Sequence, residues 1–190
     1  MKNKFSIRLI AASTSTLLHT TAFAEVDLSN GSFIYSDKSN SLAMIYNSRS
    51  LHQGLLGLGW CTPLEDSLDI LNSTTLRLRK CRVGKIVTYK LKPETLRAPS
   101  STANTYISGD EKIVSSESTF QLIKDGQKLQ TFDQHGKLIE VKDERGKVAK
   151  LIYDKNGFLK DVISGRKDSL KLKVDPRSGR LVELGDHQGA

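Results

Sequence analysis

The 190-residue chain carries 29 basic and 21 acidic residues, a formal net charge of +8, and 37% of its residues are hydrophobic. This length allows one or two domains with a core. The basic residues alternate with Asp and Glu along the chain, which favours a solvated sheet face over a nucleic-acid-binding surface. After the first 24 residues no segment approaches the ~20 apolar residues that cross a bilayer. We therefore expect no nucleic-acid partner and no transmembrane segment.

The N-terminus has the three parts of a secretory signal peptide. Basic residues come first, an apolar stretch covers residues 9–18, and Ala22-Phe23-Ala24 supplies small residues at a cleavage site. The pattern predicts a signal peptide over residues 1–24, cut before Glu25. The alternative is an amphipathic first helix of the mature fold. The cut chain has a net charge of +5, and we expect it to be exported, to the periplasm, the cell surface or the medium.

Residues 25–91 have the pattern of strands and turns. Asn30-Gly31 is a turn signal, and residues 32–35 and 42–46 read as strands. The glycine-rich run at residues 54–59 leads into Trp60 and Pro63 rather than into a helix, so it does not fit a phosphate-binding loop. We expect these glycines to let the backbone turn sharply beside the Trp60 ring.

Cys61 and Cys81 are the two cysteines of the chain. In an exported protein an even, small number of cysteines favours a disulfide. Cys81 ends the strand predicted over residues 75–80, so the bond ties the Trp60 corner to a hairpin that continues into residues 86–91. Closing such a loop stabilises by roughly 3 kcal/mol in the chain-entropy model. A zinc site or a catalytic thiol is the alternative, and neither has a histidine partner near in the sequence.

Residues 92–118 are the predicted joint between two domains. This stretch holds Pro93 and Pro99 and is rich in serine, although residues 106–107 and 113–114 are apolar enough to form short strands. The predicted organisation is a signal peptide at 1–24, an N-terminal β module at 25–118 and a repeat region at 119–190. Asp125-Gly126 predicts a tight hairpin at the start of the repeats.

A short phrase returns along the repeat region, an Asp followed after two or three residues by Gly. The Asp-to-Asp steps are 10, 11, 21 and 11 residues, and the long step indicates a degenerate turn near residues 164–167. Asp at the first turn position accepts backbone N–H groups, and Gly at the end tolerates the left-handed conformation. The predicted structural turns are Asp133 to Gly136, Asp143 to Gly146, Asp154 to Gly157, Asp175 to Gly179 and Asp186 to Gly189.

The segments between these turns predict strands. They are about five residues long and rich in β-branched and aromatic types, over residues 137–142, 147–153, 158–163, 170–174 and 181–184. Leu170, Leu172 and Val174 alternate with Lys171 and Lys173, as expected when one sheet face is dry and the other is wet. The sequence therefore predicts an all-β fold, an antiparallel meander of hairpin repeats after an N-terminal β module.

The sequence offers few candidates for catalytic chemistry. His135 and His187 fall at predicted turn tips, and His52 precedes the glycine-rich run without a nucleophile in a known context. The repeat Asp residues already have a structural duty in turns. We expect no catalytic residue, no metal and no cofactor.

Two groups of residues carry a family resemblance. Tyr153-Asp154, Gly157 and Leu159 give the full Tyr-Asp, Gly, Leu pattern, and Phe132-Asp133 gives a variant of it. Residues 30–33 and 46–60 resemble the opening module that precedes such repeats. The chain thus resembles the N-terminal part of Rhs-family secreted proteins, which contain YD repeats.

The resemblance implies a structural role. In that family the repeats form a β shell around a C-terminal toxin, and we expect no toxin domain within these 190 residues. The resemblance predicts a non-catalytic scaffold for delivery, whose expected partners are further Rhs repeats or a toxin or immunity protein, and whose last strand has an open edge. The alternative is an exported module that binds carbohydrate or a cell-surface ligand, with Tyr153 and Phe158 as aromatic platforms.

Overall fold

The structure, a computed structural model, describes residues 22–27, 32–37, 44–81, 84–93, 103–142, 146–164 and 168–188. These residues form strands β1 to β18 and one turn of 3₁₀ helix, η1 (Pro63–Glu65). The predicted all-β antiparallel fold is therefore confirmed. In the described part of the chain, no helix is long and apolar enough to cross a membrane.

The chain divides into two compact units. The first contains Met1–Glu65 and Cys81–Gly84, and the second contains Asp66–Lys80 and Lys85–Ala190. The units separate at Glu65 rather than at the predicted boundary after Ser118, because the region predicted as a joint contributes two strands to the sheet of the second unit. Tyr106 and Ile113 are buried there and hold these strands in the sheet.

The first unit is a small antiparallel sheet with a hairpin. Its sheet has the order β1 (Ala22–Asp27), β2 (Ser32–Asp37), β3 (Met44–Asn47) and β6 (Trp60–Cys61), and β4 (Gln53–Gly54) pairs with β5 (Gly57–Leu58). The Trp60 ring lies 5.2 Å from the Tyr46 ring and 6.2 Å from the Tyr35 ring, measured between centroids. β1 begins three residues before the predicted cleavage point, and the rest of the predicted signal peptide lies outside the described residues.

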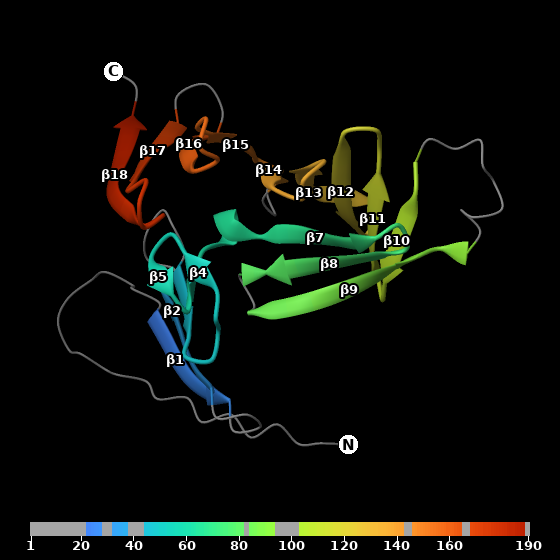
Figure 1. The fold of residues 1–190 in the computed structure, drawn as a ribbon, viewed down its shortest axis with the longest axis horizontal. Helices are drawn as coiled ribbons and strands as arrows, with labels where there is room; N and C mark the ends of the chain where they lie inside the picture. The colour runs from blue at the N-terminus through green and yellow to red at the C-terminus, as the bar shows by residue number, and fades with distance from the viewer. Residues whose placement is uncertain are drawn as a thin grey trace. The chain divides into compact units, whose positions relative to one another are not determined.

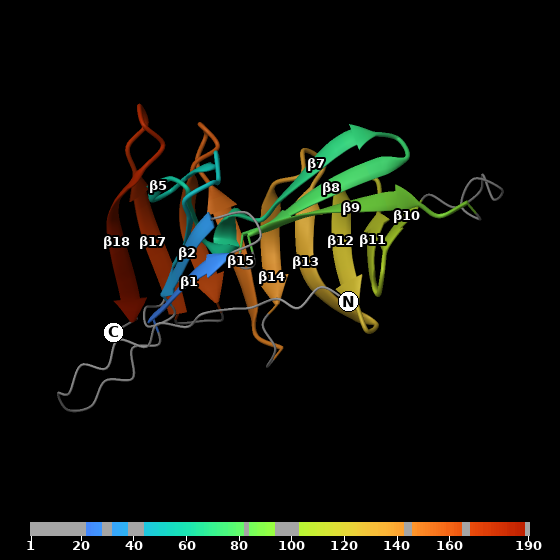
Figure 2. The same cartoon turned by 90° about the horizontal axis from the view of Figure 1, so that it is seen from below.

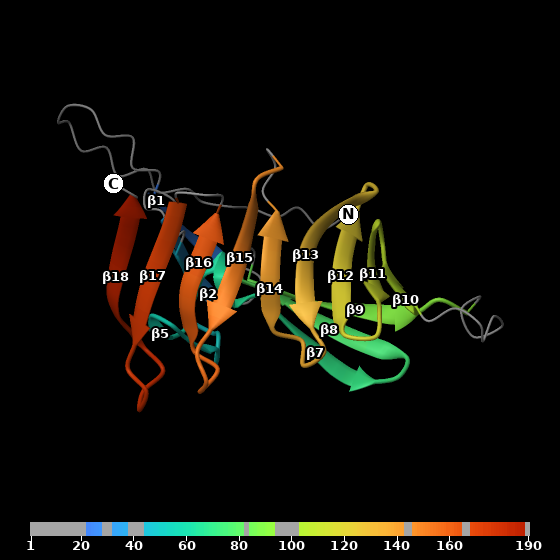
Figure 3. The ribbon, with the colours of Figure 1, turned by 90° about the horizontal axis from the view of Figure 1, so that it is seen from above.

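The second unit is one twelve-stranded meander in which every strand pairs with its sequence neighbours. Figure 3 shows β10 to β18 side by side. The strands are β7 (Ser67–Asn72), β8 (Thr75–Lys80), β9 (Lys85–Leu91), β10 (Thr105–Ser108), β11 (Glu111–Ser115), β12 (Thr119–Lys124), β13 (Gln127–Asp133), β14 (Leu138–Lys142), β15 (Val148–Tyr153), β16 (Leu159–Ser164), β17 (Asp168–Val174) and β18 (Leu181–Gln188).

The buried apolar residues of the meander all lie on one face of the sheet, which we call the inner face. Cross-strand partners share a face, and the pairs of the meander link its buried residues in sequence from β7 to β17. The inner face comprises Leu68, Leu76, Leu78, Tyr89, Tyr106, Ile113, Leu122, Phe132, Leu138, Leu151, Leu159, Val162 and Leu172.

The sheet bends so that β7 to β9 form a second layer facing β12 to β14 (Figures 1 and 2). The Leu68 N–H donates to the Gly136 carbonyl at 2.8 Å, and Ser67 forms a bridge with Lys137. The Gln130 amide also donates to Asp66 at 2.6 Å. Because of this bend, the first strand of the meander lies against the turn between β13 and β14.

Candidate functional site

Three turns of the repeat region lie at one edge of the sheet, between β13 and β14, β15 and β16, and β17 and β18. The first two have the same hydrogen bonds. Oδ1 of Asp133 accepts from the N–H groups of His135 and Lys137 at 2.9 Å each. Oδ1 of Asp154 accepts from Asn156 and Phe158, again at 2.9 Å. The carboxylate thus satisfies two donors that the sheet ladder leaves unpaired.

The third turn is one residue longer. The Gly179 N–H donates to the Asp175 carbonyl at 2.8 Å, and the Ser178 hydroxyl donates to the Asp175 carboxylate. The hydrogen bond from the Ser178 side chain lowers the pKa of Asp175. Beside each of the three turns the strand register shifts, because the strand after the turn carries one extra residue. The extra residues Ile139 and Lys160 follow Leu138 and Leu159, so that each leucine shares the inner face with the residue three positions later.

Neighbouring turns contact each other, and we call these three turns the turn row. Lys137, which follows the first turn, donates from Nζ to the Gly157 carbonyl at 2.8 Å and lies 4.5 Å above the Tyr153 ring centroid. The Tyr153 hydroxyl donates to the Leu138 carbonyl at 2.6 Å. In the next step along the row, a Cβ placed on Gly179 would lie 3.5 Å from the Phe158 ring. The residues after the first two turn glycines, Lys137 and Phe158, therefore pack onto the following turn.

The remaining predicted turns differ. Asp143 and Gly189 lie outside the described residues. Gly146, the glycine of the turn predicted from Asp143, has a φ of 82°. Asp186 does not begin a turn, which corrects the prediction: it lies inside β18, paired with Leu170. The ladder between β17 and β18 continues as far as Gln188, so strand pairing overrides the local turn preference of the Asp-x-x-Gly phrase.

The predicted disulfide between Cys61 and Cys81 is present, with the two Cα atoms 5.4 Å apart. The sequence gives these cysteines no histidine partner, and the structure corrects that expectation. One ring nitrogen of His52 and the two sulfur atoms all lie within 4.8 Å of one another. His52 is brought there because the hairpin of β4 and β5 returns the chain, so that Gly59 donates to the His52 carbonyl at 2.9 Å.

Glu65 lies beside this cluster and is held by the backbone. Its Oε1 accepts from the Leu55 N–H at 2.7 Å and its Oε2 from the Thr62 N–H at 2.8 Å. Oε1 also lies 3.4 Å from Nε2 of His52. A Cβ on Gly54 would overlap the Trp60 carbonyl and approach Oε1 of Glu65 at 2.7 Å, so only glycine fits there. No local sequence pattern indicates this group, because its members come from separate segments of the chain.

A second polar network closes one end of the inner face. The Tyr89 hydroxyl and the Lys80 ammonium both donate to the Glu111 carboxylate. Burial raises the pKa of Tyr89, and the hydrogen bond to Glu111 adds to this rise. Burial also raises the pKa of Glu111, but the hydrogen bonds from Lys80 and Tyr89 outweigh it and leave that pKa below its ordinary value. The carboxylate is thus held in its ionised form between two donors.

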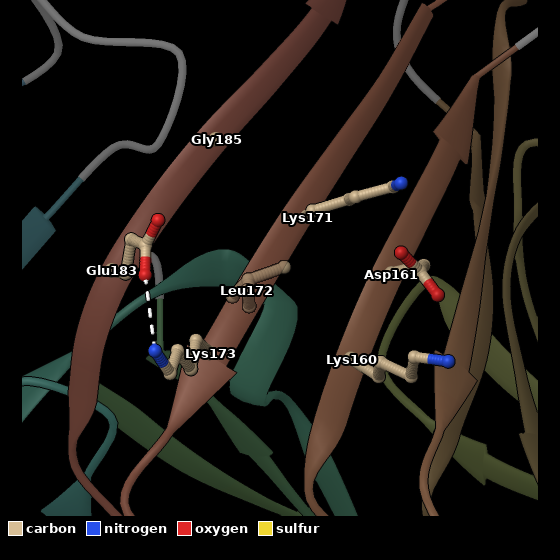
Figure 4. A pocket seen from close by; sticks show the side chains of 7 residues that line it. All are labelled: Lys160, Asp161, Lys171, Leu172, Lys173, Glu183 and Gly185. Carbon is tan, nitrogen blue, oxygen red and sulfur yellow. Dashed lines mark hydrogen bonds and ion pairs between the residues drawn. The ribbon is translucent and has the colours of Figure 1, made fainter.

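A shallow groove of about 480 Å³ lies over β16, β17 and β18 (Figure 4). Lys173 pairs with Glu183 across it at 3.4 Å, and both side chains are exposed. Gly185 lies opposite Lys171 and leaves the groove open on that side. The groove mixes both charge signs on solvated side chains and contains no aromatic ring. Its lining is Lys160, Asp161, Lys171, Leu172, Lys173, Glu183 and Gly185.

Comparison with known proteins gives no assignment. No family model matches the chain. No curated protein matches it either.

Proposed function

We propose that the chain is a non-catalytic structural scaffold, the N-terminal portion of an exported protein of the Rhs YD-repeat type. The turn row is the observation that supports this proposal. The Asp residues that contribute to the family resemblance accept hydrogen bonds within their own turns, whereas Gly157 and Tyr153 take part in contacts between successive hairpins. They serve the sheet rather than a ligand.

The curvature of the meander adds support. All buried apolar side chains of the sheet lie on its inner face, and β7 packs against the first turn of the row. A sheet that is apolar on one face and bends toward that face can enclose other chain segments as further strands are added. This is the property that a shell for a passenger domain requires.

The alternative role is an exported carbohydrate-binding module, and the groove over β16 to β18 is the surface that favours it. The two predicted aromatic platforms weaken this alternative. Tyr153 donates its hydroxyl to Leu138 and stacks under Lys137, and Phe158 packs toward Gly179. Both rings are occupied within the turn row.

A glycan array combined with unfolding measurements separates the two roles. The scaffold role predicts that Tyr153→Phe lowers the free energy of unfolding by about 1 kcal/mol, because it removes one hydrogen bond, and that no glycan binds the wild-type protein. Glycan binding that is lost in the Lys171→Ser, Lys173→Ser double variant, with the melting curve unchanged, would overturn the scaffold role in favour of the groove.

Export is the second part of the proposal, and the disulfide is compatible with an oxidising compartment. N-terminal sequencing of the protein recovered outside the cytoplasm should begin at Glu25. Thiol titration of the denatured, unreduced protein should find no free cysteine. Exported material that keeps Met1 would contradict cleavage of a signal peptide. Exported material with two free thiols would contradict the disulfide.

A further inference from the structure

We propose that Cys61, Cys81 and His52 form a zinc site when the disulfide is reduced, with Glu65 positioning the histidine. In tetrahedral zinc sites with bonds of about 2.0–2.3 Å, neighbouring ligand atoms lie roughly 3.5 Å apart. The three candidate ligand atoms already lie within 4.8 Å of one another. Side-chain rotation alone can therefore bring them around one ion.

The backbone that carries Cys61 and His52 is held by hydrogen bonds as well as by the disulfide. Cys61 lies in β6, which pairs with β3 through Ile45. The carbonyl of His52 accepts from Gly59, which closes the loop that presents the ring. Two backbone donors fix the Glu65 carboxylate against the ring. Reduction therefore leaves the Cys61 thiol and the His52 imidazole on hydrogen-bonded backbone, with the buried Cys81 thiol as the third ligand of the proposed site.

Glu65 acts as a positioning residue that orients the His52 ring. Histidines that bind zinc commonly interact with a carboxylate through their other ring nitrogen, which fixes the orientation of the ring. Oε1 of Glu65 lies 3.4 Å from Nε2 of His52, and the two side chains are only 13% and 16% exposed. The carboxylate is close enough to orient the imidazole, and its own oxygens are satisfied by the backbone.

The donor set and the burial both favour zinc. Thiolate and imidazole are its preferred ligands, and a His-Cys-Cys set leaves one position open to water. Cys81 is 1% exposed, so a bare thiolate would be costly there. Two thiolates and Zn²⁺ together carry no net charge, which removes that cost. The same cluster thus has an oxidised state with a disulfide and a reduced state with a metal.

A phosphine can serve as the reductant that converts the disulfide state into the reduced state. The phosphine gives two electrons to the bond between Cys61 and Cys81, which breaks. It becomes a phosphine oxide with the oxygen of one water, whose two protons pass to the two sulfur atoms. Zn²⁺ then displaces both protons as the thiolates bind it.

Zinc and cobalt titrations of the reduced full chain, without oxygen, test the proposal. Against a chromophoric chelator we expect one Zn²⁺ per reduced chain, and affinity at least about 100-fold lower for the oxidised chain. Co²⁺ should give the thiolate charge-transfer absorption of a tetrahedral site. His52→Ala should weaken zinc binding by about 100-fold or more and Glu65→Gln by about 10–100-fold. His135→Ala, at an exposed turn, is the matched control and should bind as the wild type does.

Three results would overturn the site. The first is reduced wild type binding zinc no better than Cys61→Ser. The second is His52→Ala with wild-type zinc affinity and cobalt spectrum. The third is a reduced chain whose melting temperature does not rise with zinc, because a metal that binds the folded site more tightly than the unfolded chain stabilises the fold. This last measurement also covers the case in which reduction alone unfolds the first unit.

Discussion

The two edges of the large sheet reverse the chain by different means. At one edge the turn row joins successive hairpins, and at the other Gly109-Asp110 and Asp125-Gly126 form two-residue loops between paired strands. In both classes glycine has a positive φ, 81° at Gly136 and 75° at Gly126. A Cβ on Gly136 would overlap the Leu68 carbonyl, whereas a Cβ on Gly126 would meet nothing within 4 Å.

The comparison separates two reasons for glycine in a turn. We call the edge with the two-residue loops the loop edge. There glycine is needed only because the backbone has a positive φ. In the turn row it meets the same requirement and also admits a neighbouring segment, the β7 backbone at the first turn and Lys137 at the second. The backbone angles alone therefore do not rank these positions by their importance for stability.

The largest effect is expected for Gly136→Val. A valine at φ 81° is strained, and its side chain would displace the β7 backbone. We expect a loss of at least about 3 kcal/mol in the free energy of unfolding, measured by urea denaturation. Gly126→Val, with the backbone strain alone, is the matched control and should lose less. Equal losses would mean that the contact with Leu68 contributes nothing.

Gly157→Val should come next, with a loss of about 1–3 kcal/mol. Its φ is 83°, but the nearest atom to an added Cβ is Nζ of Lys137, at 2.9 Å and at the end of a flexible side chain. A double-mutant cycle with Lys137→Ala measures the contact between the two turns, and we expect the two losses to be less than additive. Strictly additive losses would argue against contact along the row.

A smaller effect, dependent on pH, is expected for Glu111→Gln beside the loop edge. Glu111 accepts from Lys80 and Tyr89, so the change should cost about 1–2 kcal/mol at pH 7. Because the folded-state pKa of Glu111 is lowered, its stabilisation is present above the ordinary carboxyl pKa of 4.5 and is lost as pH falls through the folded-state value. Urea midpoints of variant and wild type should therefore converge in acid. A difference that does not shrink as the pH falls below 4.5 would contradict this.

The smallest effect is expected for the double change Lys171→Ser, Lys173→Ser. Both side chains are exposed on the outer face, so stability should change by no more than about 0.5 kcal/mol. Comparison with the midpoint of Gly157→Val gives the test. A larger loss for the lysine pair would indicate that the exposed surface of β17 is important. It would contradict the expected order, in which the turn glycine contributes more to stability.

Local patterns predicted much of this fold. The strand expected at residues 75–80 coincides with β8, and most repeat strands begin within one or two residues of their predicted starts. These features are local, since alternation and turn chemistry act over a few residues. The contact of β7 with Gly136 and the approach of His52 to the cysteines depend on how the sheet bends and how a hairpin returns. Neither of these contacts leaves a periodic signal in the sequence.

The predicted steps of 10 and 11 residues mark successive reversals of the chain, and in the antiparallel meander these reversals lie alternately at the two edges of the sheet. Only every second turn joins the row, and the phrase at Asp186 falls within a strand. A pattern of turn residues gives the spacing of reversals. It does not say which reversals pack against each other.

The spacing within the turn row limits how such a chain can change in length. Asp133 and Asp154 are 21 residues apart, as are Asp154 and Asp175, and each interval contains two strands. An inserted or deleted segment of one strand would reverse the direction of every later strand and bring a turn of the opposite edge into the row. Duplication or loss of a whole hairpin keeps both edges intact. Viable changes in the size of this sheet should therefore occur in steps of about 21 residues.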